Sequence, residues 1–165
     1  MSSDTEIHVQ SGRDAGRQLK DLLSGARMAM VTTTEPSGSL ASRPLTLQRA
    51  DEDGTVWFLV DAEAAWLSDP IGPVNVAVAT SSTWLSISGS ARLVRDQAVL
   101  DDLGDPVSDS FFDDGTTPVA LRIDTDHADY WDAPGRLVQL LAMGKGVLTG
   151  DSPDVGERGR LDQPS

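Results

Sequence analysis

The sequence predicts a mainly β domain, an antiparallel sheet closed into a barrel with helices at its ends. Segments with strand-like alternation follow one another with short turns between them, which favours antiparallel neighbours. The expected order is a helix, five closely spaced strands, acidic helices, one or two strands and a final helix. With 165 residues, 39% of them hydrophobic, the chain is long enough for one domain with a substantial core.

The individual elements follow from spacing and from turn residues. An amphipathic helix is expected in 14–25, where Ala15, Leu19, Leu22 and Leu23 recur at helical spacing before Gly25. β-branched and apolar alternation predicts strands at 26–35, 38–48, 55–61, 73–80 and 82–96, and a last strand or two at 117–132. A helical turn is expected in 62–70, short helices at 97–103 and 106–112, and a final helix at 132–144.

Composition limits the domain organisation and the partners. We expect a flexible N-terminus at 1–12, the folded domain at 13–150 and a polar, disordered tail at 151–165. The net charge of −13 makes binding to nucleic acid or to an anionic membrane unfavourable. Cysteine is absent, and neither a secretory signal nor a membrane-spanning segment is recognised, so we expect a cytoplasmic protein.

The common catalytic patterns are not found. His127 lies in an acidic segment with Asp124, Asp126 and Asp129, but Ala128 stands where a calcium loop needs a third oxygen ligand. No nucleophile motif accompanies His127. We therefore predict no metal site, interpret this segment as a polar strand end and assign no catalytic residue.

The segment 38–48 places one positive charge among core-facing residues. Arg43 shares a face with Ala41, Leu45 and Leu47, whereas the opposite face carries Ser42, Pro44, Thr46 and Gln48. An unpaired buried charge costs several kcal/mol. We therefore expect an acid or an anionic ligand beside Arg43, or a strand edge from which its guanidinium reaches water.

Several motifs in this order carry a resemblance. They are "MAMVTTTEPSGSLASRPLTL", "GTVWFLVD", "PVNVAVA", "LSISGSARLVRD" and "HADYWDAPGRLVQLLAMGKGVLTG". Together they span most of residues 19–150 and resemble the pyridoxamine 5'-phosphate oxidase-like superfamily, in its general stress protein branch. The resemblance implies an antiparallel six-stranded split β-barrel, the FMN-binding split barrel, with Greek-key-like strand connections.

The resemblance also implies a function and a site. Proteins of this kind are homodimers that hold a flavin, FMN, in clefts between the subunits, so an oxidoreductase or a general-stress flavoprotein is expected. Arg43 would take the anionic group, backbone groups of Leu45 and Val60 would meet the polar edge of the ring, and Trp84 would pack on it. The complete expected cofactor-binding set is Arg43, Pro44, Leu45, Thr46, Val60, Asp61 and Trp84.

Departures from the family pattern leave a second hypothesis open. Val60 replaces a threonine, Ala64 a serine and Trp66 a lysine, and Ala65 stands where a basic residue sometimes occurs. A hydrogen bond to a charged group contributes about 1.5–3 kcal/mol, so losing two would weaken FMN roughly 10²- to 10⁴-fold. The alternative is a split-barrel dimer that binds another flat ligand, such as a deazaflavin or haem, or no cofactor. Trp66 would either fill the phosphate region or lie in the core.

Overall fold

The computed structural model describes residues 8–68, 70–81, 83–104, 115–132 and 158–162. The elements in chain order are β1 (His8–Ser11), α1 (Arg13–Leu23), β2 (Met28–Thr34), β3 (Leu40–Ala50), β4 (Thr55–Asp61), β5 (Gly72–Ala79), β6 (Thr83–Val94), α2 (Gln97–Leu103), β7 (Pro118–Asp132) and β8 (Arg158–Asp162). None of the helices in these ranges is long and apolar enough to cross a membrane.

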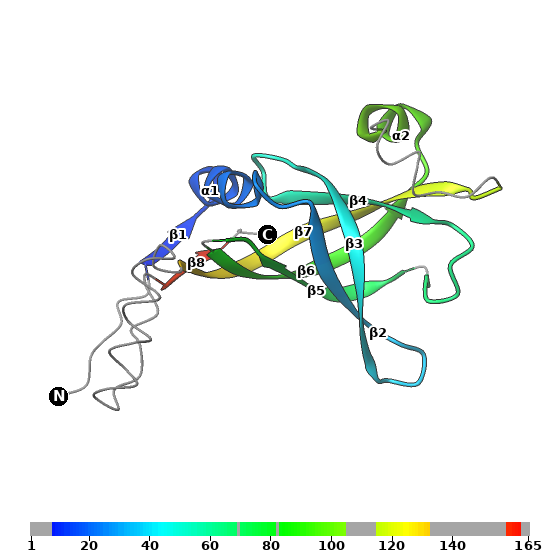
Figure 1. Ribbon diagram of the computed structural model, residues 1–165, viewed down its shortest axis with the longest axis horizontal. Coiled ribbons are helices and arrows are strands. Elements are labelled where there is room, and N and C mark those ends of the chain that lie inside the picture. Colours follow the sequence, from blue (N-terminus) through cyan, green and yellow to red (C-terminus); the bar gives the residue numbers. More distant parts are fainter. Residues whose placement is uncertain (1–7, 69, 82, 105–114, 133–157, 163–165) are drawn as a thin grey trace.

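Strands β2 to β7 form a closed antiparallel barrel (Figure 1). The order around it is β7-β4-β3-β2-β5-β6, and pairing of β6 with β7 closes the ring. Strand β7 pairs with β4 over its first half and with β8 over its second half, and β8 in turn pairs with β1 in parallel. The predicted fold class, a split β-barrel with flanking helices, is confirmed.

The alternating burial of the strands explains why these segments close a barrel. In β2, Ala29, Val31 and Thr33 are buried, whereas Met28 and Met30, which alternate with them, are exposed. Inward-facing apolar side chains of the other barrel strands, such as Phe58, Val76 and Ile87, join the same interior cluster. In β2, β5 and much of β6, every second residue is therefore removed from water, and this burial stabilises the barrel.

Helix α1 covers one end of the barrel, as its spacing predicts. Ala15, Leu19 and Leu23 are buried in the interior cluster. Gly16 lets the helix approach the turn after β3, because a Cβ atom there would lie 2.1 Å from the backbone oxygen of Glu52. A side chain at this position would push the helix away from the sheet.

Helix α2 forms a second, smaller apolar cluster on the outside of the barrel. Asp96 caps its first turn by accepting a hydrogen bond of 2.8 Å from the backbone N–H of Ala98. Leu103 then packs with Trp57 and Ala120. Figure 1 shows α1 and α2 well apart, with β7 running the length of the barrel between the two regions.

Some expected elements differ or lie outside the described residues. The helix at 97–103 is confirmed. Of the segment 62–70, residues 62–67 form successive turns instead, with Ala64 N–H donating to the carbonyl of Asp61 and Leu67 N–H donating to that of Ala64. The helices expected at 106–112 and 132–144 lie outside the described residues. Strands β1 and β8 lie within the terminal segments for which the composition favours flexibility, and Leu161 of β8 is buried.

Candidate functional site

The barrel is open along part of the seam between β3 and β4. The two strands pair only from Leu47 opposite Phe58 onward. In the described residues, the first half of β3 pairs with β2 alone, and the end of β4 pairs with β7 alone. The facing edges of 40–46 and 59–61 are thus left without a strand partner, which makes their backbone groups available to a ligand.

A pocket of about 320 Å³ lies at this opening, and we call it the seam pocket. It brings together residues from the start of β2, from β3, from the end of β4 and from the turns that follow β4. Its lining residues are Met28, Pro44, Leu45, Thr46, Gln48, Leu59, Val60, Asp61, Ala64 and Trp66. Of the expected cofactor-binding residues, Pro44, Leu45, Thr46, Val60 and Asp61 therefore meet in one place.

Arg43 lies next to this pocket and has an internal partner. Its guanidinium forms an ion pair with Glu35 and donates a hydrogen bond of 3.0 Å to Thr33 Oγ1. The guanidinium carbon also lies 4.7 Å from the centre of the Trp66 ring. The side chains of Arg43 and Glu35 are only 23% and 26% exposed. The expected surroundings of Arg43 were an acid, an anionic ligand or a strand edge open to water, and the structure shows an acid, Glu35.

The β2–β3 hairpin explains this pairing. Val31 lies opposite Arg43 and Thr33 opposite Ala41, so these four side chains share the inner face. The same two-residue period continues into the turn and places Glu35 on that face, where its N–H donates to the carbonyl of Ser39 at 2.8 Å. No sequence motif marks Glu35, but continuing the two-residue alternation of β2 up to the turn places it on the face of Arg43.

Trp66 takes part in both of the roles considered for it. Its ring packs against the interior cluster and also lines the seam pocket, beside Ala64. An indole offers one N–H donor and no charge. Asp61 shapes this wall, because its carboxylate accepts a hydrogen bond of 3.0 Å from the N–H of Glu63. Ala65 is exposed and does not line the pocket.

Trp84 lies elsewhere on the surface. It lines a second pocket of about 430 Å³, which we call the outer pocket, together with Met28, Met30, Pro44 and Ala77. Met28 and Pro44 belong to both pockets, so the two hollows are adjacent. Within one chain, Trp84 therefore shares a hollow with Pro44 but not with Leu45, Thr46, Val60 or Asp61.

The seam pocket offers shape and backbone groups rather than reactive side chains. None of its described lining residues carries a positive charge, and Asp61 carries a negative one. His127 lies on β7 opposite Ser88, away from both pockets. Among the described residues, no group of three or more His, Cys, Asp or Glu could hold a metal ion. The arrangement is suited to binding a flat, largely uncharged molecule.

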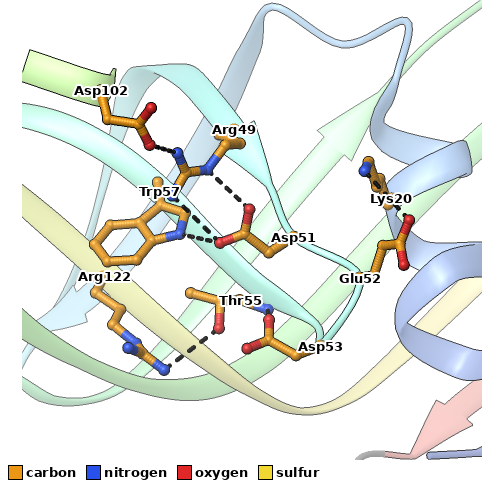
Figure 2. A network of polar contacts seen from close by, with 9 residues as sticks. All are labelled: Lys20, Arg49, Asp51, Glu52, Asp53, Thr55, Trp57, Asp102 and Arg122. Carbon is orange, nitrogen blue, oxygen red and sulfur yellow. Dashed lines mark hydrogen bonds and ion pairs between the residues drawn. The ribbon is translucent and has the colours of Figure 1, made fainter. Parts of the chain in front are cut away.

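A second arginine of β3 lies in a different kind of cluster, shown in Figure 2. The register between β3 and β4 shifts between Leu47 and Arg49, which turns Arg49 to the outside, opposite Trp57. Arg49 pairs with Asp51, with 2.8 Å between Nε and Oδ1, and also with Asp102 of α2. Asp51 in turn accepts a hydrogen bond of 2.7 Å from the indole N–H of Trp57.

Comparison with solved structures agrees with this architecture. A protein described as general stress protein 26 from Jannaschia sp. CCS1 superposes with a TM-score of 0.68 at 20% identity, over 90% of this chain and 98% of that one. The general stress FMN/FAD binding protein from Xanthomonas citri has a TM-score of 0.58 at 28% identity, over 72% and 87%. A general stress family protein from Xanthomonas campestris pv. campestris has a TM-score of 0.58 at 29% identity, over 73% and 88%.

Sequence comparison gives the family. No curated protein matches the chain significantly. The family model described as pyridoxamine 5'-phosphate oxidase like matches residues 14–154, which include the whole described barrel. By its sequence and its split-barrel fold, the chain belongs to the pyridoxamine 5'-phosphate oxidase-like family.

Proposed function

We propose that this protein binds the ring system of a flavin in the seam pocket and acts as a flavoprotein oxidoreductase or general-stress protein. The observation that carries this proposal is the convergence of Pro44, Leu45, Thr46, Val60 and Asp61 on one pocket at the open seam. Family membership supports it, as does the similarity to the FMN/FAD binding protein of Xanthomonas citri. A bound isoalloxazine would supply the redox chemistry, and the protein would position it.

The pocket residues fit the ring of FMN and do not fit its phosphate. Leu45, Val60 and Trp66 offer apolar surface, and the facing edges of β3 and β4 offer backbone donors and acceptors for a heteroaromatic rim. A phosphate dianion would find no positive charge among the described lining residues. Arg43 is near, but it is already paired with Glu35.

The proposed active form is a homodimer, with a second copy covering the outer pocket. Met28, Met30 and Trp84 are 50%, 42% and 37% exposed, respectively, which is unusual for large apolar side chains that lie together. The described lining of the outer pocket carries no charge. Two chains with a net charge of −13 repel one another, so an uncharged apolar face is the favourable place for them to meet.

Sedimentation of the purified chain tests the dimer. We expect twice the mass of one chain, and we expect Met30→Glu to give monomers because the new charge would be buried at the contact. Ala98→Glu, on exposed α2, adds the same charge away from this face and serves as the control. A wild-type monomer at all accessible concentrations would contradict the dimer.

Flavin binding is tested directly by fluorescence quenching of riboflavin and FMN on titration with the protein. We expect saturable quenching of riboflavin at micromolar protein concentrations, weakened by Val60→Asp, which would bury a charge against the ring. Val74→Asp, which adds the same charge at a similarly buried valine of β5 outside the pocket lining, is the matched control. The absence of quenching for both flavins at tens of micromolar protein would overturn the proposal.

The second candidate function is binding of another flat ligand, such as a deazaflavin or haem, or a purely structural role of the dimer. The observation that favours it is again the absence of a positive charge from the described lining of the seam pocket. A thermal-shift panel of FMN, riboflavin, a deazaflavin, haem and pyridoxal phosphate separates the candidates. Stabilisation by a flavin alone would remove this alternative, because only a ligand that binds the native state raises Tm.

A further inference from the structure

The positive charge nearest to the seam pocket is neutralised within the protein. Arg43 forms its ion pair with Glu35 on the inner face of the hairpin, and the hydrogen bond to Thr33 Oγ1 fixes the guanidinium further. Both charged side chains are mostly buried. To contact a ligand anion, Arg43 would have to leave a partly desolvated carboxylate behind, and an uncompensated charge in such surroundings is costly.

The pocket itself has a negative electrostatic environment. Asp61 is the charged residue among its described lining residues, and the whole chain carries a net charge of −13. Trp66 presents its ring to the pocket and contacts Arg43, so the pocket wall at this point is an aromatic surface. A flat neutral ligand loses little on entering such a site, whereas a dianion loses hydration without gaining a counter-charge.

We infer that the seam pocket selects a flavin without a terminal phosphate, of the riboflavin class, and that Glu35 sets this preference by occupying Arg43. The inference rests on the proposed function, because it assumes that the pocket binds a flavin ring. It adds the chemical class of the ligand and a specificity-determining residue that does not line the pocket. Glu35 acts through Arg43 and is therefore a positioning residue.

Titration of the wild-type protein with riboflavin and with FMN gives the first test. We expect riboflavin to bind at least as tightly as FMN. Raising the ionic strength should tighten FMN binding, since it screens the repulsion between the dianion and the acidic protein, and should leave riboflavin binding unchanged. FMN binding that is more than roughly tenfold tighter than riboflavin binding, or that weakens with salt, would overturn the inference while leaving the proposed function intact.

Glu35→Gln gives the second test. The amide keeps the shape of the side chain and removes its charge, so Arg43 becomes available to a phosphate, and FMN should bind roughly tenfold more tightly. Riboflavin affinity should stay unchanged. Glu63→Gln, exposed and close to the pocket, removes the same charge away from Arg43 and should change neither affinity appreciably.

The remaining outcomes are also decisive. Equal gains in FMN affinity in Glu35→Gln and Glu63→Gln would show that general charge rather than Arg43 controls the preference, and would overturn the role of Glu35. If neither flavin binds the wild-type protein, the proposed function itself fails. Should Glu35→Gln not fold, the affinity ratio and the salt dependence of the wild-type protein decide the ligand class without it.

Discussion

Two arginines of β3, six residues apart, lie over tryptophan rings and pair with acids, yet their surroundings differ. Arg43 pairs with one acid, Glu35, from its own hairpin, and lies 4.7 Å from the centre of the Trp66 ring. Arg49 pairs with two acids from different segments, Asp51 and Asp102, and lies 5.5 Å from the centre of the Trp57 ring.

The difference separates an arginine that joins elements from one that borders a site. Arg49 connects β3, the turn after it and α2. The guanidinium carbon of Arg122 also lies 5.4 Å from the centre of the Trp57 ring (Figure 2). Burial alone would lower the pKa of Arg49, but hydrogen bonds to Asp102 and Asp51 raise it above its usual value. Arg43 pairs with one acid instead of two and lies beside an opening. A single substitution, Glu35→Gln, is therefore expected to change what Arg43 can bind.

The largest expected effect distinguishes the two tryptophans. Trp57→Ala should lower the free energy of unfolding by about 3–5 kcal/mol, because Trp57 is buried, hydrogen-bonded and placed between two arginines. Trp66→Ala should cost about 1–2 kcal/mol, because Trp66 is partly exposed at a pocket. Urea denaturation measures both. Equal losses would show that the Arg43 region is as structural as the Arg49 region.

The next largest effect is expected when a positive charge is added to the lining of the seam pocket. Ala64→Ser combined with Trp66→Lys places a hydroxyl and a positive charge in the lining of the seam pocket, and should raise FMN affinity at least roughly tenfold. Ala64→Ser with Trp66→Gln removes the indole without adding charge and is the control. Equal affinities in the two double variants would indicate that the phosphate does not approach this wall.

A smaller effect is expected at the surface of the Arg49 cluster. Asp102→Asn should lower the free energy of unfolding by about 0.5–1 kcal/mol, because Asp102 is 67% exposed and Arg49 keeps Asp51. The flavin affinity of the Asp102→Asn variant should equal that of the wild-type protein, in contrast to that of the Glu35→Gln variant. Thermal unfolding and flavin titration on the same samples check both statements, and a changed flavin affinity would contradict the separation of the two clusters.

The smallest expected effect is on the stability of the protein in acid, and it concerns Asp53 in the turn between β3 and β4. Burial on its own would raise the pKa of Asp53, but hydrogen bonds from Thr55 and the charge of Arg122 bring it below its usual value. A lowered pKa in the folded state stabilises the protein above the unfolded pKa of about 3.9. This contribution is lost as the pH falls through the folded pKa. Asp53→Asn should therefore show a shallower loss of stability below pH of about 4 than the wild-type protein.

Much of the barrel could be predicted from the sequence because alternation reports burial directly. The strands and α1 follow from residues such as Val31, Val76 and Leu19, which are buried as their spacing requires. Alternation fails at the irregularity between Leu47 and Arg49, where one extra residue reverses the faces. Strands β1 and β8 are short and lie in terminal segments, and in the polar tail Leu161 supplies the apolar anchor of β8.

The candidate site could be predicted from the sequence only where its residues lie on two strands that are neighbours in the sheet, β3 and β4. Leu45 and Val60 follow from their motifs and meet in the seam pocket. Trp84 does not join them within one chain, because β2 and β5 lie between β3 and β6 in the sheet. The charge state of the site depends on Glu35, whose contact with Arg43 is set by the hairpin register rather than by a motif.

The position of β7 in the ring has a consequence for folding kinetics. This strand, the last of the barrel in chain order, pairs with both β6 and β4, so the ring closes only after residues 118–132 have been made. The partners joined by β4 and β7 are far apart in sequence, and such contacts slow folding. During synthesis, the edges of β4 and β6 that pair with β7 therefore stay uncovered until β7 has been made.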